Sequence, residues 1–279
     1  MTKSNLSIAF FGTPELTKTI LDEMVSAGFA PKVVVTMPDR KSGRKMLLTA
    51  PAAKDWALAH DTQVLQPEKL DEHFMAEFKK LGIDVCVVVA YGKILPTELL
   101  QIPKYGMYNV HYSLLPELRG ATPVESAILL GKTETGVTIQ KIVSKLDAGD
   151  IVMQEKFTIN RDEKASELRE RLNERAKKMV VETLASIETG TLSAMAQDES
   201  KATYCGKIKK EDGKIDLTGD DTENYNKYRA YFGWPNVYFF DTDGKRIVVK
   251  EAVLVDGKFT ILRVTPEGKK ETSWPVILK

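Results

Sequence analysis

Short runs of β-branched and aliphatic residues alternate with amphipathic stretches from residue 7 to about residue 190. The apolar runs predict strands, and several are apolar on both faces, which is typical of buried parallel strands. Between the first two runs, Leu16, Ile20 and Met24 recur at the spacing of one helical face. The alternation predicts an α/β fold, a mostly parallel sheet with helices on both faces. The expected strands are Ser7–Phe11, Val33–Thr36, Val85–Ala90, Met107–His111, Val137–Ile142 and Ile151–Phe157.

The pattern changes after residue 190. Residues 191–205 are rich in Ser, Thr, Ala and acidic side chains and show weak periodicity, so we interpret them as a linker. From residue 206 onward, short apolar runs predict a small antiparallel sheet or partial barrel, and Asp256-Gly257 suits a tight hairpin turn between two of them. We therefore expect a large domain over residues 1–190, a linker over 191–205 and a small β domain over 206–279.

Composition narrows the functional classes only slightly. The chain has 279 residues, with 40 basic and 39 acidic side chains, which excludes a protein-wide basic field but allows local basic patches. Its two cysteines, Cys86 and Cys205, are too far apart in the sequence for a disulfide framework or a zinc pattern. The apolar run Ile8–Phe11 is too short for a signal-peptide core or a membrane span. These features predict a cytoplasmic protein that does not enter a membrane.

The candidate catalytic residues lie near the end of one predicted strand, Met107–His111. Asn109 and His111 lie two residues apart, so they project from the same face and can converge on one small group. A buried structural histidine beside a strand-end asparagine explains the pair about equally well. Asp147 occupies a turn between two predicted strands and can bring a carboxylate to the imidazole, although an ordinary turn aspartate explains it better when it is taken alone.

The motifs around these residues resemble those of the 10-formyltetrahydrofolate-dependent formyltransferases, and most closely the methionyl-tRNA formyltransferases among them. The resemblance is specific because the motifs follow one another in the same order over most of residues 7–157. They are Phe11–Pro14, Pro38–Arg40 with Gly43-Arg44, Val87–Pro96, Asn109–Pro116, Arg119–Pro123, Glu134–Thr138 and Asp147–Asp150. The resemblance implies a Rossmann-like domain followed by an OB-like β-barrel. This chain's C-terminal part is shorter than is typical of the family, so we expect a reduced barrel.

The resemblance also implies the roles of individual residues. Asn109, His111 and Asp147 would form the catalytic triad. The folate site would include Ala90, Tyr91, Gly92, Ser113, Leu114, Leu115 and Pro116. The acceptor substrate would contact Phe11, Gly12 and Thr13 near a methionyl pocket, and Arg40 and Arg44 on a basic loop that meets the tRNA. A tight strand-to-helix turn explains residues 11–13 about as well, and basic loops of this kind are usually only solvated.

The chemistry of the three residues suits formyl transfer. An amine that attacks a formyl carbon places negative charge on the formyl oxygen, which amide and imidazole donors can stabilise. A carboxylate near a histidine can accept the proton that the amine loses, and no metal is needed. We therefore expect 10-formyltetrahydrofolate as cosubstrate and the α-amino group of initiator methionyl-tRNA as acceptor, in a protein that acts as a monomer. Formylation of a nucleotide-linked amino sugar, or a non-catalytic folate- or RNA-binding module, are the alternatives.

Overall fold

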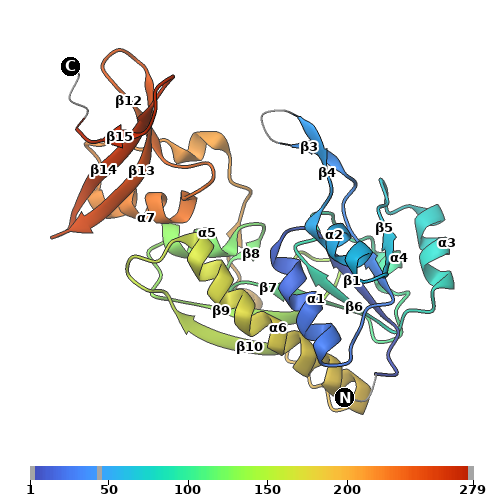
Figure 1. Ribbon diagram of the computed structural model, residues 1–279. Helices are drawn as coiled ribbons and strands as arrows, with labels where there is room; N and C mark the ends of the chain where they lie inside the picture. The colour runs from blue at the N-terminus through green and yellow to red at the C-terminus, as the bar shows by residue number, and fades with distance from the viewer. Residues whose placement is uncertain (1–3, 43–45, 276–279) are drawn as a thin grey trace. The chain divides into compact units, whose positions relative to one another are not determined.

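The computed structural model describes residues 4–42 and 46–275. Its central element is a seven-stranded sheet in the order β10-β9-β7-β6-β1-β2-β5 (Figure 1). The pairs along β7-β6-β1-β2-β5 are parallel, and β9 pairs with β7 in the antiparallel sense. The strands are β1 (Ile8–Gly12), β2 (Val33–Val35), β5 (Gln63–Leu65), β6 (Val85–Val89), β7 (Met107–His111), β9 (Glu134–Lys141) and β10 (Ile151–Thr158). The expected α/β fold with a mostly parallel sheet is confirmed.

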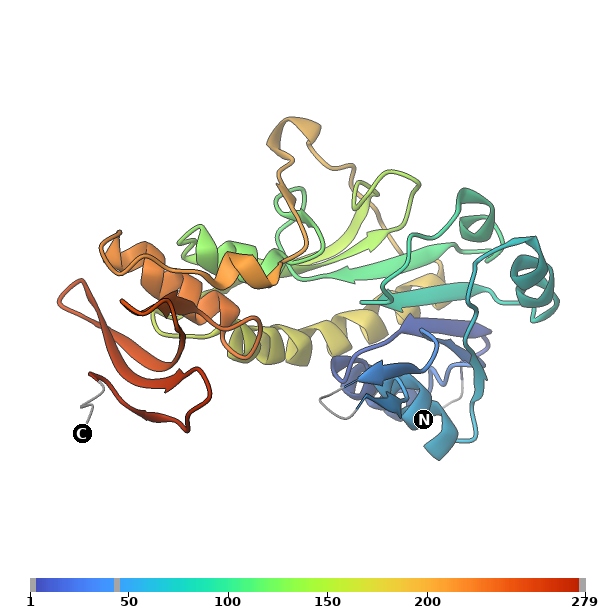
Figure 2. The same ribbon diagram turned by 90° about the horizontal axis from the view of Figure 1, so that it is seen from above.

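Helices cover both faces of this sheet. On one face, Val180, Leu184 and Ile187 of α6 surround a small void together with Val87 and the neighbouring strands. Figure 2 shows α6 running along the sheet. The opposite face packs against α3, whose Phe74 and Phe78 join a buried cluster with strand residues of β1, β2 and β6. The helices of this part are α1 (Leu16–Ser26), α2 (Ala52–Ala59), α3 (Glu72–Lys80), α4 (Thr97–Leu100), α5 (Pro123–Leu129) and α6 (Ala165–Thr189).

The basic loop expected after residue 39 is a hairpin at its described positions. β3 (Arg40–Ser42) pairs in the antiparallel sense with β4 (Leu47–Thr49). Arg40, Lys41 and the aliphatic residues Met46–Leu48 are exposed. The strands are only three residues long, which is too short for an alternating pattern to be recognised in the sequence.

The C-terminal strands form a four-stranded antiparallel sheet in the order β12-β13-β14-β15. Asp256-Gly257 joins β13 to β14, as the sequence predicts. Two of the short apolar runs of this part, Ile247–Val249 and Ala252–Val255, belong to one strand, β13, which has a register shift near Glu251. This confirms the expected small antiparallel β domain. Its strands are β12 (Tyr238–Phe240), β13 (Arg246–Val255), β14 (Lys258–Pro266) and β15 (Thr272–Ser273), and a further helix, α7 (Asp221–Tyr231), precedes them.

The chain divides into two compact units that are interleaved in the sequence. The first contains the residues up to Arg119 together with Gly136–Glu155 and Leu172–Ala202. The second contains Gly120–Thr135, Lys156–Arg171 and the residues from Thr203 onward. Within the second unit α5 packs against α7, whose tyrosines are buried. The linear division at residues 190–206 therefore stays a prediction. Short elements complete the chain: β8 (Arg119–Gly120), β11 (Tyr204–Cys205), η1 (Glu199–Lys201) and η2 (Lys210–Gly213).

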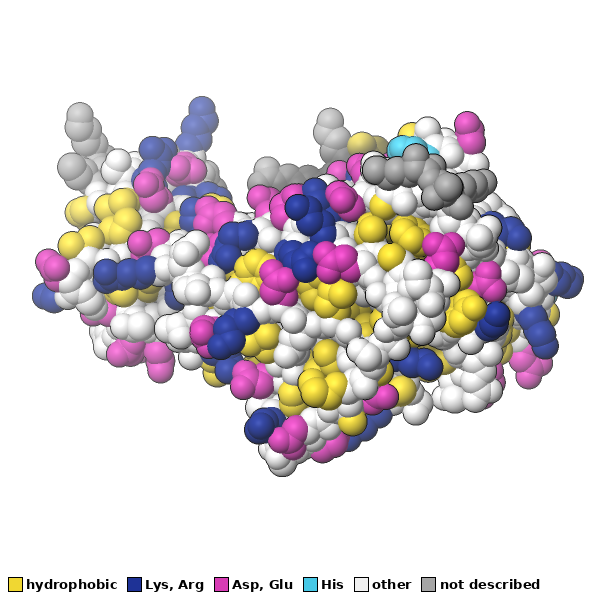
Figure 3. All heavy atoms as spheres, turned by 90° about the horizontal axis from the view of Figure 1, so that it is seen from below, with side chains coloured by type: hydrophobic (Ala, Val, Ile, Leu, Met, Phe, Trp, Pro, Cys, Tyr) yellow, Lys and Arg dark blue, Asp and Glu magenta, His cyan; other side chains and the backbone are white. Residues whose placement is uncertain are grey.

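The surface carries both signs of charge, as the balanced composition requires. Figure 3 shows basic and acidic side chains interspersed over the face that it presents. Across residues 4–42 and 46–275, a membrane-crossing helix, which needs a long and apolar stretch, is not found.

Candidate active site

The two polar residues of β7 share one face of the sheet. Asn109 lies opposite Val88 on β6 and Gln140 on β9, and His111 lies opposite Thr138 on β9. Because side chains alternate along a strand, these polar residues all project toward the same side. His111 is buried, with 4% of its surface exposed, while Asn109 is partly exposed. The strand therefore presents a sheltered imidazole next to an accessible amide.

A loop between β9 and β10 brings Asp147 to this face. Its Oδ2 lies 3.7 Å from Nδ1 of His111. Its Oδ1 accepts a hydrogen bond of 2.8 Å from Nε2 of Gln140. The backbone of Asp147 has a φ of 46°, in the left-handed region that residues with a Cβ rarely adopt. The structure thus brings together the histidine and the aspartate that the sequence singled out, although 36 positions separate them.

The hydrogen bond of the His111 ring to Leu118 fixes its tautomer. Nε2 lies 2.9 Å from the carbonyl oxygen of Leu118, and a carbonyl only accepts, so Nε2 carries the proton. Nδ1 then directs a lone pair toward the carboxylate of Asp147. Burial lowers the pKa of His111 below its ordinary value, while the charge of Asp147 and the Leu118 carbonyl oppose that shift. The ring is therefore neutral near pH 7, and a proton that reached Nδ1 would lie beside a carboxylate.

The predicted folate segment 113–116 is tied to β9 and β10 by one hydroxyl. Thr138 donates through Oγ1 to the carbonyl oxygen of Ser113 at 2.6 Å. Oγ1 of Thr138 also accepts hydrogen bonds from the backbone nitrogen of Leu115 at 3.3 Å and from Nε2 of Gln154 at 2.9 Å. Gln154 also donates to the Leu115 carbonyl oxygen at 3.0 Å. The segment is held by side chains from two strands, with Ser113 and Leu115 buried and Leu114 and Pro116 partly exposed.

The other predicted folate segment, residues 90–92, follows β6. Ala90 and Gly92 have φ values of 46° and 95°, and both are exposed. Between them, Tyr91 is buried, which raises the pKa of its hydroxyl to about 12. That hydroxyl has no hydrogen-bond partner among the described residues. Thr13 donates through Oγ1 to the Tyr91 carbonyl oxygen at 2.8 Å, so the β1–α1 turn lies beside this segment.

Residues predicted to bind the acceptor occupy different environments. Phe11 is fully buried and makes edge-on ring contacts with Phe78 and Tyr91, as a core side chain does. A Cβ at Gly12 would lie 2.6 Å from Cε1 of Phe10, 2.8 Å from Cγ2 of Thr17 and 3.1 Å from the carbonyl oxygen of Val89, so a side chain there would displace its neighbours. Arg40 is exposed on β3, and Arg44 lies outside the described residues. Their contacts with a substrate stay predictions.

Sequence reasoning missed several polar side chains of this region. Thr138 and Gln140 alternate within β9, which is otherwise buried and apolar at its centre, and that alternation was a readable signal. Gln154 and Gln197 gave no such signal, because their partners are distant in the sequence. No group of three His, Cys, Asp or Glu side chains suited to a metal ion occurs within residues 4–42 and 46–275.

Comparison with known protein families gives two matches. Residues 6–184 match the formyl transferase family, and residues 207–269 match the formyl transferase C-terminal domain. The chain is 43% identical over 236 residues to a methionyl-tRNA formyltransferase of Caldicellulosiruptor saccharolyticus, covering 84% of this chain and 75% of that protein. It is 37% identical over 284 residues to the methionyl-tRNA formyltransferase of Thermodesulfovibrio yellowstonii, covering 94% and 92%.

Solved structures share the fold at lower identity. A sugar 3N-formyl transferase, solved in the presence of dTDP and 5-N-formyl-THF, aligns with a TM-score of 0.70 and 16% identity, covering 95% of this chain and 99% of that one. An N-formyltransferase of Helicobacter canadensis, in complex with folinic acid and dTDP-3-aminofucose, aligns with a TM-score of 0.70 and 19% identity, covering 90% and 88%. At these identities the likeness shows the fold alone.

Proposed function

Because the chain belongs to the formyl transferase family, we propose that it transfers the formyl group of 10-formyltetrahydrofolate to the α-amino group of methionyl-tRNA. The product is formylmethionyl-tRNA, which serves translation initiation. The observation that carries this function is the identity of 37–43% with methionyl-tRNA formyltransferases from several bacteria over most of the chain. The grouping of His111, Asp147 and the neighbouring Asn109 on one sheet face supports the chemistry.

The transfer requires one bond to form and one to break. The amine nitrogen bonds to the formyl carbon, and the carbonyl electron pair moves onto the formyl oxygen. When that pair returns, the bond between the formyl carbon and the folate nitrogen breaks. The amine loses one proton, and the departing folate nitrogen gains one. The α-amino group titrates near about 7.7–8.0, and the adjacent ester lowers that value, so much of it is neutral and nucleophilic at physiological pH.

We propose a separate role in the transfer for each of the three polar residues, Asn109, His111 and Asp147. The partly exposed amide of Asn109 donates to the formyl oxygen as negative charge develops there. The carboxylate of Asp147 accepts the proton of the amine, directly or through Nδ1 of His111 at 3.7 Å. The Leu118 carbonyl holds the ring in the tautomer that leaves Nδ1 able to take that proton. An imidazolium formed in this way is stabilised by the adjacent carboxylate.

The folate cosubstrate is assigned to the two segments that border β6 and β7. Ala90 and Gly92 are exposed and have positive φ values, and the small size of these two residues leaves room for a planar heterocycle to approach the backbone closely. Residues 113–116 are held by hydrogen bonds from Thr138 and Gln154 to their carbonyl oxygens. This arrangement suits a site that binds its ligand through preformed backbone donors and acceptors.

The tRNA is assigned to the β3–β4 hairpin. Arg40 and Lys41 are exposed cations, and phosphate contacts by such residues release counterions and strengthen binding. Arg44, which lies outside the described residues, belongs to the same basic stretch. The turn Phe11–Thr13 is assigned to the methionyl side of the site, where Gly12 and Thr13 lie next to segment 90–92. We further propose that the protein acts as a monomer in the cytoplasm.

A direct assay tests the function against its alternative. The fold match extends over 99% of the solved sugar 3N-formyl transferase and 88% of the N-formyltransferase of Helicobacter canadensis. This shared fold favours a dTDP-linked amino sugar as the second candidate acceptor. The protein is incubated with formyl-labelled 10-formyltetrahydrofolate and either methionyl-tRNA or dTDP-3-aminofucose. We expect label in methionyl-tRNA. Label that appears only in the amino sugar would overturn the assignment.

A further inference from the structure

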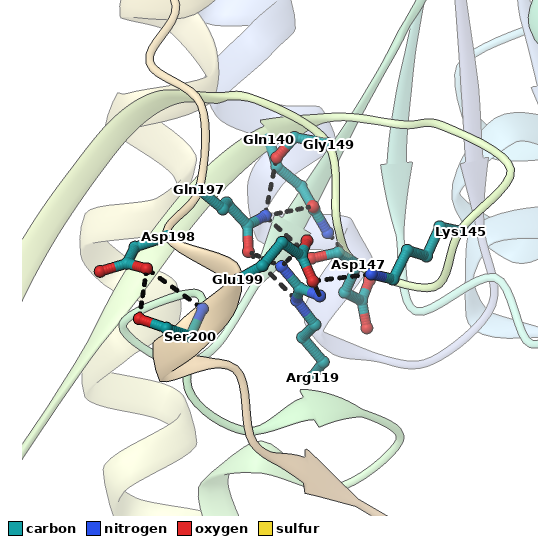
Figure 4. A network of polar contacts seen from close by, with 9 residues as sticks. All are labelled: Arg119, Gln140, Lys145, Asp147, Gly149, Gln197, Asp198, Glu199 and Ser200. Carbon is teal, nitrogen blue, oxygen red and sulfur yellow. Dashed lines mark hydrogen bonds and ion pairs between the residues drawn. The ribbon is translucent and has the colours of Figure 1, made fainter.

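The loop that carries Asp147 is held by a set of polar side chains that the proposed mechanism does not use. Figure 4 shows this network, in which Gln197 and Glu199 follow α6, Arg119 belongs to β8, and Lys145 precedes Asp147 in the loop. All of these residues belong to the first compact unit. The segment of residues 195–199 thus contacts the site loop although the sequence pattern indicates a linker there.

The loop needs an external restraint. Asp147 adopts a φ of 46°, a conformation that costs free energy in a residue with a Cβ and persists only where the surrounding structure enforces it. At the other end of the turn, a Cβ at Gly149 would overlap the carbonyl oxygen of Lys141, so the backbone there approaches β9 closely. The residues on the outer side of the loop, 143–146, are exposed. The position of the Asp147 carboxylate therefore depends on contacts made from outside the loop.

Gln197 supplies two of these contacts to the loop backbone. Its Nε2 donates to the carbonyl oxygen of Asp147 at 2.9 Å and to that of Gly149 at 2.7 Å. A primary amide has two N–H groups, so these two bonds use both. A longer contact of 3.3 Å joins the same nitrogen to Oε1 of Gln140, whose own Nε2 holds the Asp147 carboxylate. Gln197 thus holds the backbone of Asp147, and Gln140 holds the side chain of Asp147.

Arg119 sets the orientation of the Gln197 amide. The Oε1 of Gln197 accepts from Nε of Arg119 at 3.1 Å and from Nη2 at 2.7 Å. A guanidinium has donors only and the loop carbonyls are acceptors only, so the reversed amide would place like groups against each other on both sides. Gln197 therefore accepts hydrogen bonds from the guanidinium through its oxygen and donates to the loop through its nitrogen.

The buried charge of Arg119 is balanced by Glu199. Arg119 is fully buried and donates from Nη1 and Nη2 to the two carboxylate oxygens of Glu199 at 3.1 and 2.9 Å. Lys145 of the loop adds a contact of 2.6 Å to Glu199. The hydrogen bonds from Arg119 lower the pKa of Glu199 to about 2, so the ion pair stays intact throughout the neutral range.

We propose that Gln197, oriented by the Arg119–Glu199 ion pair, is a positioning residue that holds the Asp147 carboxylate at His111 for formyl transfer. This inference rests on the proposed function, because it assigns Gln197 a role through Asp147. A displacement of a reacting group by about 1 Å can cost on the order of 100-fold in rate, so loss of these hydrogen bonds affects turnover more than substrate binding.

Two substitutions at position 197 test the proposal in the full-length protein. Gln197→Met keeps the length of the side chain but removes both donors, so we expect kcat to fall by about 10- to 100-fold while both KM values stay within about twofold. Gln197→Glu can still accept from Arg119 but cannot donate to the loop carbonyls, and we expect a similar loss. It also keeps the test available if the methionine variant does not fold. The control is Lys201→Ala, an exposed residue on η1 that pairs with Asp198, and this substitution should leave kcat unchanged.

A double-mutant cycle separates positioning from a general structural role. If Gln197 acts through Asp147, adding Gln197→Met to Asp147→Asn should lower kcat by less than about twofold further, because the interaction is already lost. A folded Gln197→Met variant with normal kcat, or a full additional loss on top of Asp147→Asn, would overturn the inference. Wild-type protein that formylates only an amino sugar would overturn the proposed acceptor instead, and the same cycle would then be measured with that sugar.

Discussion

Asp147→Asn is the most informative single substitution in the site, because it changes the charge while keeping the shape. The carboxylate accepts from Gln140 through Oδ1 and faces Nδ1 of His111 through Oδ2. An asparagine can keep the first contact with its carbonyl oxygen. Its amide nitrogen would then face Nδ1, where it would donate to the ring lone pair. The substitution therefore holds His111 in the neutral tautomer and removes the group that we propose as the acceptor of the amine proton.

The magnitude follows from these contacts. General acid–base assistance of this kind contributes about 100- to 10,000-fold to a rate, so kcat should fall by at least about 100-fold. The KM values should change little, since the lost interaction acts on the transition state. The pKa of His111 should also fall, because Asp147 is the charge that opposes the effect of burial. Single-turnover transfer of labelled formyl to methionyl-tRNA measures the first effect, and NMR titration of the ring measures the last.

Asp150→Asn provides the matched control. Asp150 lies three residues further along the same loop and is exposed, so its substitution should leave kcat unchanged. Thermal unfolding of both variants should resemble that of the wild type. If Asp147→Asn turned over at nearly the wild-type rate, the carboxylate would not be the proton acceptor and the division of roles among Asn109, His111 and Asp147 would be refuted.

Three further predictions concern the surroundings of the site. Thr138→Val should raise the KM for 10-formyltetrahydrofolate and cost about 1–3 kcal/mol of stability, because it leaves buried groups of the 113–116 segment unpaired. The control is Thr135→Val, which removes a buried hydroxyl without a partner among the described residues and should cost little stability. Equal effects of the two substitutions would contradict this prediction. Arg40→Ala should reduce the slope of log affinity for methionyl-tRNA against log salt by about one unit, and an unchanged slope would mean that the hairpin cation is only solvated. The contribution of neutral His111 to the free energy of unfolding should be fully present above pH 6.5 and should decrease as the pH falls below it, because burial lowers the pKa of His111 in the folded state. In urea unfolding, the His111→Gln variant should lose less stability than the wild type over this pH range. Equal losses in the two proteins would show that other groups cause the pH dependence.

The sequence predicted the sheet well because buried parallel strands leave a strong apolar signal. All six strands expected in the first 160 residues occur, with ends that shift by at most three positions. β5 was missed because its three residues, Gln63–Leu65, are at most partly buried and include a glutamine, whereas the equally short β2 is a run of three buried valines. α7 was missed for a different reason. Its buried face is built from tyrosines and asparagines, so the polar segment Asp221–Tyr231 lacks the aliphatic repeat that marks an amphipathic helix.

The site was predictable to the extent that its residues lie on one strand. Alternation along β7 places Asn109 and His111 on one face without any tertiary knowledge. The position of Asp147 depends on a loop conformation with positive φ, which its residue type alone does not require. The residues alone allowed this placement but favoured an ordinary turn aspartate, and the family resemblance supplied the placement at His111; the structure separates Oδ2 of Asp147 from Nδ1 of His111 by 3.7 Å.

The network around Gln197 could not be inferred from hydrophobic patterning, and the cause is general. Periodicity records which side chains are buried against a core, so a segment that works through hydrogen bonds to a loop leaves no period. Residues 191–202 are such a segment: Met195 forms a single β-bridge with Ile151, and Gln197 and Glu199 then turn their polar ends toward the loop and Arg119. Weak periodicity in this stretch is thus compatible with a defined position. A polar segment that follows the last helix of a catalytic domain should be tested for contacts with the site before it is treated as a linker.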